Sequence, residues 1–185
     1  MGHQQPDQAL ALIRFWFEEL RPADWWRKDA QLDALLRERF GALHAQAAAG
    51  ECWPWRATAD GRLAEVLLLD QFSRNLFRDT PQAFAQDGMA LALAQEAVAG
   101  GHDKALPAER RAFLYMPYMH SESRRVHEEA LRLFSHPELA FNLDFERRHL
   151  AIIERFGRYP HRNAILGRVS TAEEREFLKQ PGSSF

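Results

Sequence analysis

The sequence has little cysteine and no long run of apolar residues. Its one cysteine, Cys52, has no internal disulfide partner, which is typical of a reducing compartment. We expect this thiol to be a small buried apolar group rather than a nucleophile. The first residues carry no cationic segment of the kind that opens a signal peptide. The apolar run Val66–Leu69 lies between two acids and is far shorter than the ~20 residues that span a bilayer. We therefore expect a soluble, cytoplasmic protein without a membrane partner.

The net charge is close to zero, and lysine is rare. The formal charge of the 185 residues is −2 at pH 7, which argues against a nucleic-acid partner because nonspecific affinity comes from phosphate neutralisation. Arginine outnumbers lysine by 21 to 3, and a codon bias can explain that preference. It does not explain why six arginines lie from Arg147 to Arg168 beside a single acid, Glu154.

Several motifs of familiar enzyme folds are absent. The sequence contains no GxGxxG, no GxxxxGK[ST] and no GxSxG, which disfavours nucleotide-binding folds and α/β-hydrolases. It also lacks CxxC and HExxH, so we expect no metal and no cofactor. The five tryptophans are interpreted as core and loop anchors rather than as platforms for stacked bases.

Apolar residues recur at helical spacing along almost the whole chain, and no stretch alternates as a strand does. Short loops between helices indicate antiparallel neighbours. We therefore predict an all-α fold of seven to eight helices in antiparallel hairpins or a bundle. Without a low-complexity linker, residues 1–185 are predicted to form one domain, with a frayed tail at about 181–185. The expected helices cover about residues 7–20, 29–49, 63–77, 80–99, 107–114, 122–134, 142–156 and a short stretch from 171.

The first polar motif is LLLDQFSRNLFR, residues 67–78. On an α-helix Asp70, Arg74 and Arg78 lie at i, i+4 and i+8 and form one row. Apolar residues surround this row, and unpaired buried charge is costly, so the charges must either pair or line a wet pocket. An Asp70–Arg74 pair at a half-exposed edge and a ligand-lining role are equally compatible with the pattern.

The second motif is YMPYMHSE, residues 115–122. Pro117 is expected to interrupt a helix, and Ser121 is expected to cap the next helix, which would begin at Glu122. These structural roles account for Ser121 and Glu122. The alternatives for His120 and Glu122 are metal ligands, which the lack of a metal-binding motif disfavours, and an acid–base pair.

The third motif is ERFGRYPHRN followed by ILGR, residues 154–168. Gly157 and Pro160 predict a helix end and a turn, with Arg155, Arg158, Arg162 and Arg168 around it. Guanidinium groups bind carboxylate or phosphate through two parallel hydrogen bonds, so the turn is a candidate anion site. The alternative is that each arginine pairs with a nearby acid or a helix-end carbonyl.

Together these motifs resemble the bacterial family DUF924, a domain of unknown function. The family pattern has an early WF, then LLLDQFPRNxFR, PxxHSE, ERFGRFPHRNxxLGR and T-x-E-E. This chain carries each of them, with Ser73 where the family often has proline and Tyr159 in place of phenylalanine. Serine at 73 should straighten the helix. The resemblance covers nearly the whole chain and implies a tetratricopeptide-like helical superhelix, but it implies no reaction.

The leading functional hypothesis is a domain that binds a small anionic ligand bearing phosphate or carboxylate. The expected ligand contacts are Arg74, Asn75, Arg78, Arg155, Arg158, Arg162 and Asn163.

Two alternatives come from other functional classes. One is a hydrolase, with Asp70, His120, Glu122 and His161 as candidate proton carriers. The other is a protein- or peptide-binding scaffold, which predicts an exposed apolar groove and motif residues that are mainly structural. The oligomeric state does not follow from the sequence.

Overall fold

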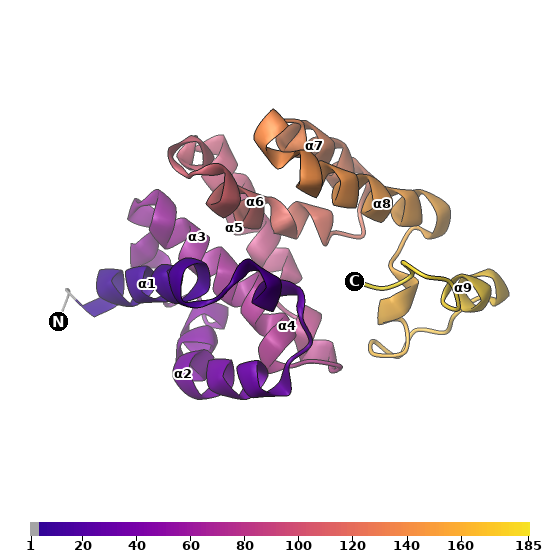
Figure 1. Cartoon of the computed structure of the whole chain (residues 1–185), viewed down its shortest axis with the longest axis horizontal. Helices are drawn as coiled ribbons and strands as arrows, with labels where there is room; N and C mark the ends of the chain where they lie inside the picture. The colour runs from indigo at the N-terminus through magenta and orange to yellow at the C-terminus, as the bar shows by residue number, and fades with distance from the viewer. Residues whose placement is uncertain (1–3) are drawn as a thin grey trace. The chain divides into compact units, whose positions relative to one another are not determined.

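The computed structural model describes residues 4–185, and these form helices, turns and loops without a strand. The all-α prediction is therefore confirmed. The α-helices are α1 (Gln4–Arg14), α2 (Ala30–Ala48), α3 (Ala59–Leu67), α4 (Ser73–Leu76), α5 (Asp87–Ala99), α6 (Ala108–Met119), α7 (Arg124–Phe134), α8 (Ala140–Phe156) and α9 (Ala172–Phe177) (Figure 1). Within the described residues, no helix is both long and apolar enough to cross a membrane.

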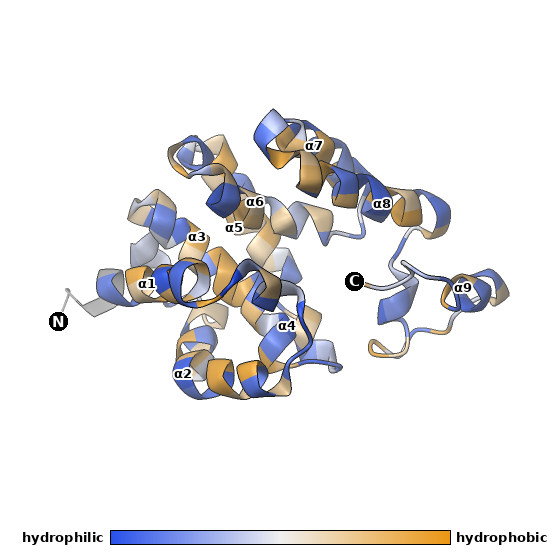
Figure 2. Cartoon of the chain, viewed as in Figure 1, coloured by the Kyte–Doolittle hydropathy of each residue, from blue (hydrophilic) through white to orange (hydrophobic). Residues whose placement is uncertain are grey.

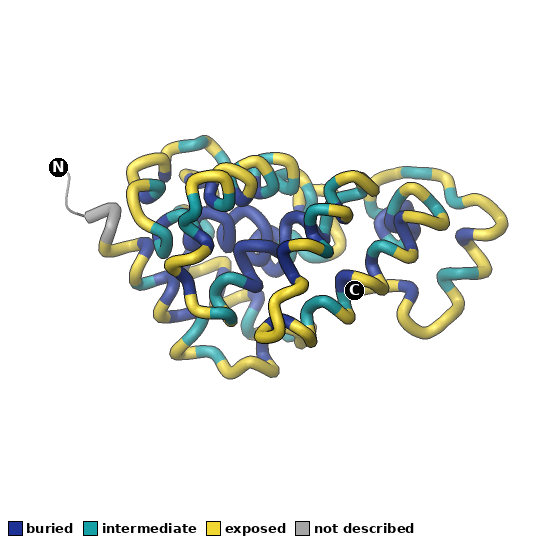
Figure 3. Tube along the Cα trace, turned by 90° about the horizontal axis from the view of Figure 1, so that it is seen from above, coloured by how far each residue is buried: buried dark blue, intermediate teal, exposed yellow. Residues whose placement is uncertain are grey.

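The chain divides into two compact units. Unit 1 comprises Met1–Arg78 and Gln82–Pro117, and unit 2 comprises Asp79–Pro81 and Tyr118–Phe185. Each helix carries both hydrophilic and hydrophobic residues (Figure 2). Buried and exposed positions alternate along the chain accordingly (Figure 3), as expected of helices that bury one face. The prediction of one domain over residues 1–185 and the tetratricopeptide-like superhelix stay predictions.

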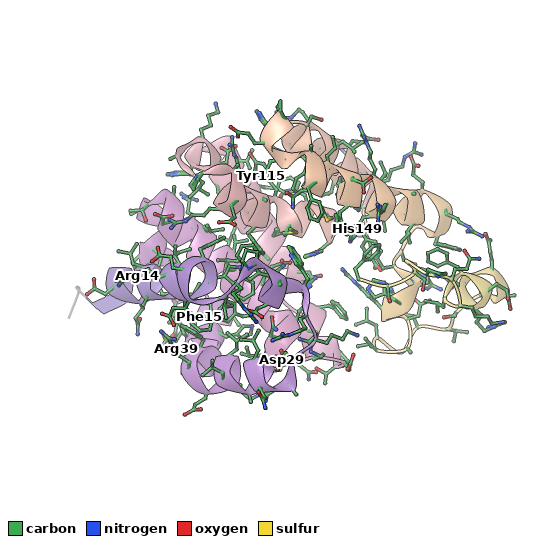
Figure 4. The ribbon with its side chains drawn as sticks, viewed as in Figure 1. Arg14, Phe15, Asp29, Arg39, Tyr115 and His149 are labelled. Atoms are coloured by element: carbon green, nitrogen blue, oxygen red, sulfur yellow. The ribbon has the colours of Figure 1, made fainter. Side chains whose placement is uncertain are left out.

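The core of unit 1 is built on aromatic rings. Trp16 is 1% exposed, and its ring lies 5.2 Å from Phe72 and 5.8 Å from Phe113, the latter edge to face. Trp25 Nε1 donates to the backbone carbonyl of Trp16 at 2.9 Å, which satisfies the indole N–H beside the core. Nearby, the guanidinium of Arg39 covers the Phe15 ring at 4.6 Å (Figure 4). In this unit α1 packs on α3, and α3 packs on α5.

The helix that carries the first motif is not a regular α-helix. Its middle, Leu68–Phe72, is π-helical, and α4 then ends at Leu76. The expectation of one row through Asp70, Arg74 and Arg78 is therefore wrong. The π turn changes the angular spacing, and Arg78 lies beyond the helix end, before Asp79 with its positive φ of 61°.

Two other local predictions are corrected in the same way. Pro117 does not interrupt its helix, because α6 continues to Met119, close enough to the end that few hydrogen bonds are affected. Ser121 does not cap a helix at Glu122. The helix begins at Arg124 with Ser123 as its N-cap residue, and Ser121 Oγ accepts from the Ser123 N–H at 3.1 Å.

Unit 2 is organised by α7 and α8, which pack side by side. Beyond them, Gly157 adopts the left-handed conformation (φ 69°) and ends α8 as expected. An irregular segment then leads to α9. The helix expected from residue 171 begins with a capping box, since Thr171 Oγ1 accepts from the Glu174 N–H while Glu174 Oε2 accepts from the Thr171 N–H. Unit 2 contains a small hydrophobic cluster of Ile152, Ile153 and Tyr159. Phe156 and Phe177 pack against this cluster.

A first prediction concerns Asp33, which is 8% exposed and accepts hydrogen bonds from Asn75 and Arg78 at 2.6–2.8 Å. Asp33→Ala should lower the free energy of unfolding by about 3 kcal/mol, because it strands a guanidinium and an amide in a largely buried place. Denaturant unfolding measures this. Asp144→Ala, which removes an exposed pair with Arg148, is the control and should cost less than about 1 kcal/mol. Equal losses in the two variants would contradict the prediction.

Candidate functional site

In unit 1 the predicted ligand contact Arg74 binds carboxylates. It forms two hydrogen bonds to Asp87, at 2.8 and 3.0 Å, and one to the backbone carbonyl of Asp70 at 3.0 Å. Its Nη1 also lies 3.5 Å from Asp70 Oδ1. The Asp70 carboxylate is 1% exposed and accepts a further hydrogen bond from Gln71 at 2.7 Å. The pairing alternative raised by the sequence is thus what the structure has for Asp70 and Arg74.

Asn75 and Arg78 converge on a residue that the motif does not contain. Asn75 Nδ2 donates to Asp33 Oδ1 at 2.8 Å, and Arg78 binds both oxygens of the same carboxylate. Asp33 stands in the first turn of α2, more than 40 positions earlier. These two side chains therefore join α2 to the end of α4.

A histidine–serine pair in unit 1 has the spacing of a general base and a nucleophile, but the serine does not donate its proton to the histidine. His44 Nε2 lies 2.8 Å from Ser73 Oγ, and both residues are buried. Ser73 Oγ donates its one proton to the carbonyl of Leu69 at 2.6 Å, so it accepts from His44 Nε2–H. Burial lowers the pKa of His44, which keeps the ring neutral. The pair is a structural hydrogen bond and occupies the position where the family often has proline.

In unit 2 the arginine-rich motif is neutralised by acids from outside it. Arg155 pairs with Glu173 at 2.8 Å on the surface. Arg158 binds both oxygens of Glu174 at 2.7 and 2.8 Å and the carbonyl of Val169. The hydrogen bond from Arg158 lowers the pKa of Glu174 to about 2, against the effect of burial. The positive charge that clusters in the sequence is therefore balanced in space.

Asn163 and Arg168 close the irregular segment. Asn163 is fully buried and donates to Ser170 Oγ at 3.1 Å and Glu174 Oε2 at 3.3 Å. Arg168 donates to Asn163 Oδ1, to the carbonyl of Tyr159 and to both oxygens of Glu122. These side-chain bonds supplement the backbone hydrogen bonds of the segment, among them Arg168 N–H to the Asn163 carbonyl at 2.8 Å.

Glu122, a candidate proton carrier, is held as a carboxylate. Its Oε1 accepts from the backbone N–H of Tyr159 at 2.7 Å, and Arg168 binds both oxygens. Burial raises the pKa of Glu122, but the Arg168 and Tyr159 hydrogen bonds and the charges of Arg168 and Arg162 outweigh it, so the pKa is lowered. A carboxylate stabilised in this way is a weak general base.

The histidine–carboxylate pair of unit 2 lies elsewhere, between α7 and α8. His127 Nδ1 is 2.6 Å from Glu146 Oε1, and both residues are 0% exposed. His127 Nε2 lies 2.8 Å from the carbonyl of Ser121, which can only accept, so Nε2 carries a proton. Burial raises the pKa of Glu146, partly offset by His127, and its Oε2 has no hydrogen-bond partner among the described residues. One proton is thus shared between Glu146 and His127 Nδ1, sealed from solvent.

Tyr159 is the centre of a group of nitrogen-bearing side chains. Its hydroxyl donates to the carbonyl of Met119 at 2.5 Å and lies 3.2 Å from His127 Nε2. The rings of His149 and His161 are each 5.7 Å from its ring. The guanidinium of Arg162 covers the ring at 4.8 Å. The hydroxyl that distinguishes this chain from the family pattern is therefore used in the core.

The histidines around Tyr159 influence one another. His149, on α8 (Figure 4), is 5% exposed and donates Nδ1–H to the carbonyl of Phe145 at 2.8 Å. Burial lowers the pKa of His149 to about 3, and the electrostatic influence of His120 and His161 acts in the same direction. His120 and His161 are half-buried, and the carbonyl of His120 accepts from Arg162 Nη2 at 3.0 Å.

The comparisons with known proteins identify the family. The sequence profile of the family described as "Bacterial protein of unknown function (DUF924)" matches residues 12–182. The chain belongs to this family. It is similar to the solved structure of a protein of unknown function from Agrobacterium tumefaciens, at 40% identity and a TM-score of 0.89, with 94% of this chain and 97% of that chain covered. No curated protein matches the sequence.

Two buried residues of this DUF924 member were not predicted from the sequence. His127 and Glu146 were not candidates, although a signal for Glu146 exists. It lies three residues before His149, and both occupy the buried stripe of α8 that also contains Ile153. A charged residue on such a stripe indicates a buried partner. The partner itself, 19 positions earlier, has no sequence signal.

The chemistry available to this family member is limited by these pairings. Within residues 4–185, no three His, Cys, Asp or Glu side chains are grouped so that they could hold a metal ion. Cys52 is 2% exposed and burial raises its pKa to about 11, so it stays a thiol, as expected. His127, His149 and His161 border the Tyr159 ring together with Arg162, and of these three histidines His161 is half-buried.

A second prediction tests the shared proton of Glu146. Glu146→Ala should lower the free energy of unfolding by about 3 kcal/mol or more, because it leaves His127 Nδ1 without its partner in the core. Glu146→Gln should cost less than about 1 kcal/mol, because an amide N–H can donate to Nδ1 as the protonated acid does. Denaturant unfolding at pH 7 compares them. If Gln is as damaging as Ala, the pair is a carboxylate with an imidazolium instead.

A third prediction follows from His149. The unfolded chain protonates this residue below about pH 6.5, whereas the folded protein keeps it neutral to about pH 3. The free energy of unfolding should therefore fall as the pH decreases through this window, by about 2 kcal/mol at pH 5 relative to pH 7. His149→Gln should remove that part of the pH dependence in denaturant melts. The exposed His136 gives the control, and His136→Gln should leave the profile unchanged. An unaltered profile for His149→Gln would contradict the assignment.

Proposed function

We propose that unit 2 binds a small carboxylate- or phosphate-bearing molecule beside Tyr159. Arg162 and the imidazoles of His120 and His161 supply the cationic and N–H-donating contacts. The observation that carries the proposal is that His161 and Arg162 both lie against the buried Tyr159 ring, while the backbone carbonyl of His120 accepts from Arg162. Guanidinium and imidazole groups recognise carboxylate and phosphate through charge-assisted hydrogen bonds.

The proposed contact set is narrower than the one expected from the sequence. Arg74, Arg78, Arg155 and Arg158 each bind a carboxylate of this chain, and Asn75 and Asn163 bind within the same networks. A guanidinium with both donor edges on an internal carboxylate has little to offer a ligand. Arg162 donates to the backbone carbonyl of His120 and covers the Tyr159 ring, which places it beside His161.

The hydrolase alternative has weaker support. Asp70 and Glu122 are bound by Arg74 and Arg168, which disfavours them as general bases. The His127–Glu146 pair has suitable geometry but is 0% exposed, and a catalytic group must reach its substrate.

The scaffold alternative is favoured in one respect, since the motif arginines act mainly as structural side chains. Large exposed apolar residues are present, among them Trp26, Trp53 and Phe141. They do not carry an argument for a particular partner, because single exposed apolar side chains are ordinary on protein surfaces.

The experiment titrates the full chain with sodium acetate and with inorganic phosphate at constant ionic strength. Binding should shift the ring resonances of the histidines and raise the melting temperature by a few degrees at ten times Kd. Arg162→Lys should weaken the affinity about 10-fold, because lysine keeps the charge but loses the planar fork. Arg155→Lys is the matched control at an exposed arginine and should bind as the unmodified protein does.

His161→Asn, a half-buried position, provides a second variant with little expected effect on folding. Its unliganded melting temperature should match that of the unmodified protein while its affinity for acetate falls. The proposal is wrong if neither acetate nor phosphate shifts the histidine resonances or the melting temperature. It is equally wrong if Arg162→Lys and Arg155→Lys bind alike.

A further inference from the structure

Three rings of unit 2 surround the side chain of Phe185. The Phe185 ring stacks on His149, with centroids 3.7 Å apart and planes at 23°. Tyr159 and His161 meet the same ring edge to face, at 6.5 and 6.0 Å. We call the three residues His149, Tyr159 and His161 the ring cradle. One face is stacked and two sides are edge contacts, which is the arrangement that a flat aromatic ring prefers.

The ring cradle is held in place independently of its occupant. The hydrogen bond from His149 Nδ1 to the Phe145 carbonyl fixes the imidazole plane. The hydrogen bond from the Tyr159 hydroxyl to the Met119 carbonyl fixes the phenol. A preformed site of this kind loses little entropy when a ring binds.

The occupant is held more loosely than the cradle. Phe185 is 50% exposed, although its ring covers a histidine that is only 5% exposed. Before it, Gly182 has a positive φ of 77°, and Ser183 Oγ donates to the Leu178 carbonyl at 3.2 Å. The segment 181–185 therefore contacts unit 2 through the Ser183 hydroxyl and the Phe185 ring. The fraying expected of this segment stays a prediction. A half-exposed ring can leave such a site at small cost.

The cradle borders the proposed anion contacts. His161 belongs to both, and the Tyr159 ring that flanks Phe185 is also the ring that Arg162 covers. A ring in the cradle would therefore contact His161 directly, together with the Tyr159 ring that Arg162 covers.

We infer that the ring cradle is a subsite for the aromatic ring of the anionic ligand, which makes the ligand class an aromatic acid, and that Phe185 fills this subsite in its absence. The inference rests on the proposed function, because the anion contacts supply the second half of the recognition. Phe185 then competes with the ligand as a tethered ring, at an effective concentration in the millimolar range.

The test uses the full chain, with acetate as the acid alone and phenylacetate as the acid with a ring. Phe185→Ala should bind phenylacetate about 10-fold more tightly than the unmodified protein, because the tethered competitor is gone. Acetate should bind both proteins equally. The matched control is Phe141→Ala, which removes another exposed phenylalanine of the same unit. Phe141 precedes His149 by eight positions on α8, about 12 Å along the helix, and its variant should behave as the unmodified protein.

The titration of His149 gives a second readout that needs no ligand. Removing the Phe185 ring exposes the imidazole face, so the pKa of His149 should rise from about 3 in Phe185→Ala, and phenylacetate should lower it again. NMR of ring-labelled histidine measures both changes.

The outcomes separate the two proposals. If acetate binds in an Arg162-dependent manner but phenylacetate binds Phe185→Ala no more tightly than acetate does, the aromatic subsite is wrong and the anion site stands. Equal phenylacetate affinity in Phe185→Ala and the unmodified protein likewise overturns Phe185 as the competitor. If neither acid binds any variant, the proposed function fails, and the ligand class fails with it.

Discussion

The hydrogen bond between His127 and Glu146 is the interaction on which unit 2 depends. It joins α7 to α8 at a point without solvent, and through the other imidazole nitrogen it reaches the carbonyl of Ser121 and the hydroxyl of Tyr159. Four separate segments thus meet at one ring. A buried polar network stabilises a fold only when nearly all of its members are satisfied, which restricts how these segments can be placed. Tyr159 is consequently fixed, and every contact proposed for a ligand is arranged around it.

Arginine plays the complementary role nearer the surface of both units. Arg78 reaches Asp33 across 45 positions, and Arg168 reaches Glu122 across 46. Arg158 closes a shorter loop to Glu174. Each pair uses the guanidinium fork on both oxygens of a carboxylate, a geometry that lysine cannot reproduce. The arginine preference in this chain has, for these residues, a structural use.

The same pairings decide where function can be sought. A carboxylate held by an arginine is a weak base, and a fully buried imidazole has no access to a substrate. The half-buried imidazoles of unit 2 are His120 and His161, and near them lie the buried Arg162 and the ring cradle filled by Phe185. These groups suit recognition of a charged aromatic molecule better than hydrolysis. Membership of the DUF924 family and the likeness to the Agrobacterium protein are consistent with a shared fold and bring no activity.

The sequence by itself determined the helical class, because apolar spacing and caps are local properties. Asp29 caps α2, Gly157 ends α8 and Thr171 with Glu174 opens α9, and each was readable within four residues. The motifs that carry the polar residues were also found from the sequence. The regular helical row predicted within the first motif was wrong, because a π turn depends on how the surrounding helices pack. Only the tertiary structure decided which acid each arginine binds, and that His127 meets Glu146. A hydrogen bond between distant positions depends on the path of the whole chain between them, and periodicity contains no information about that path.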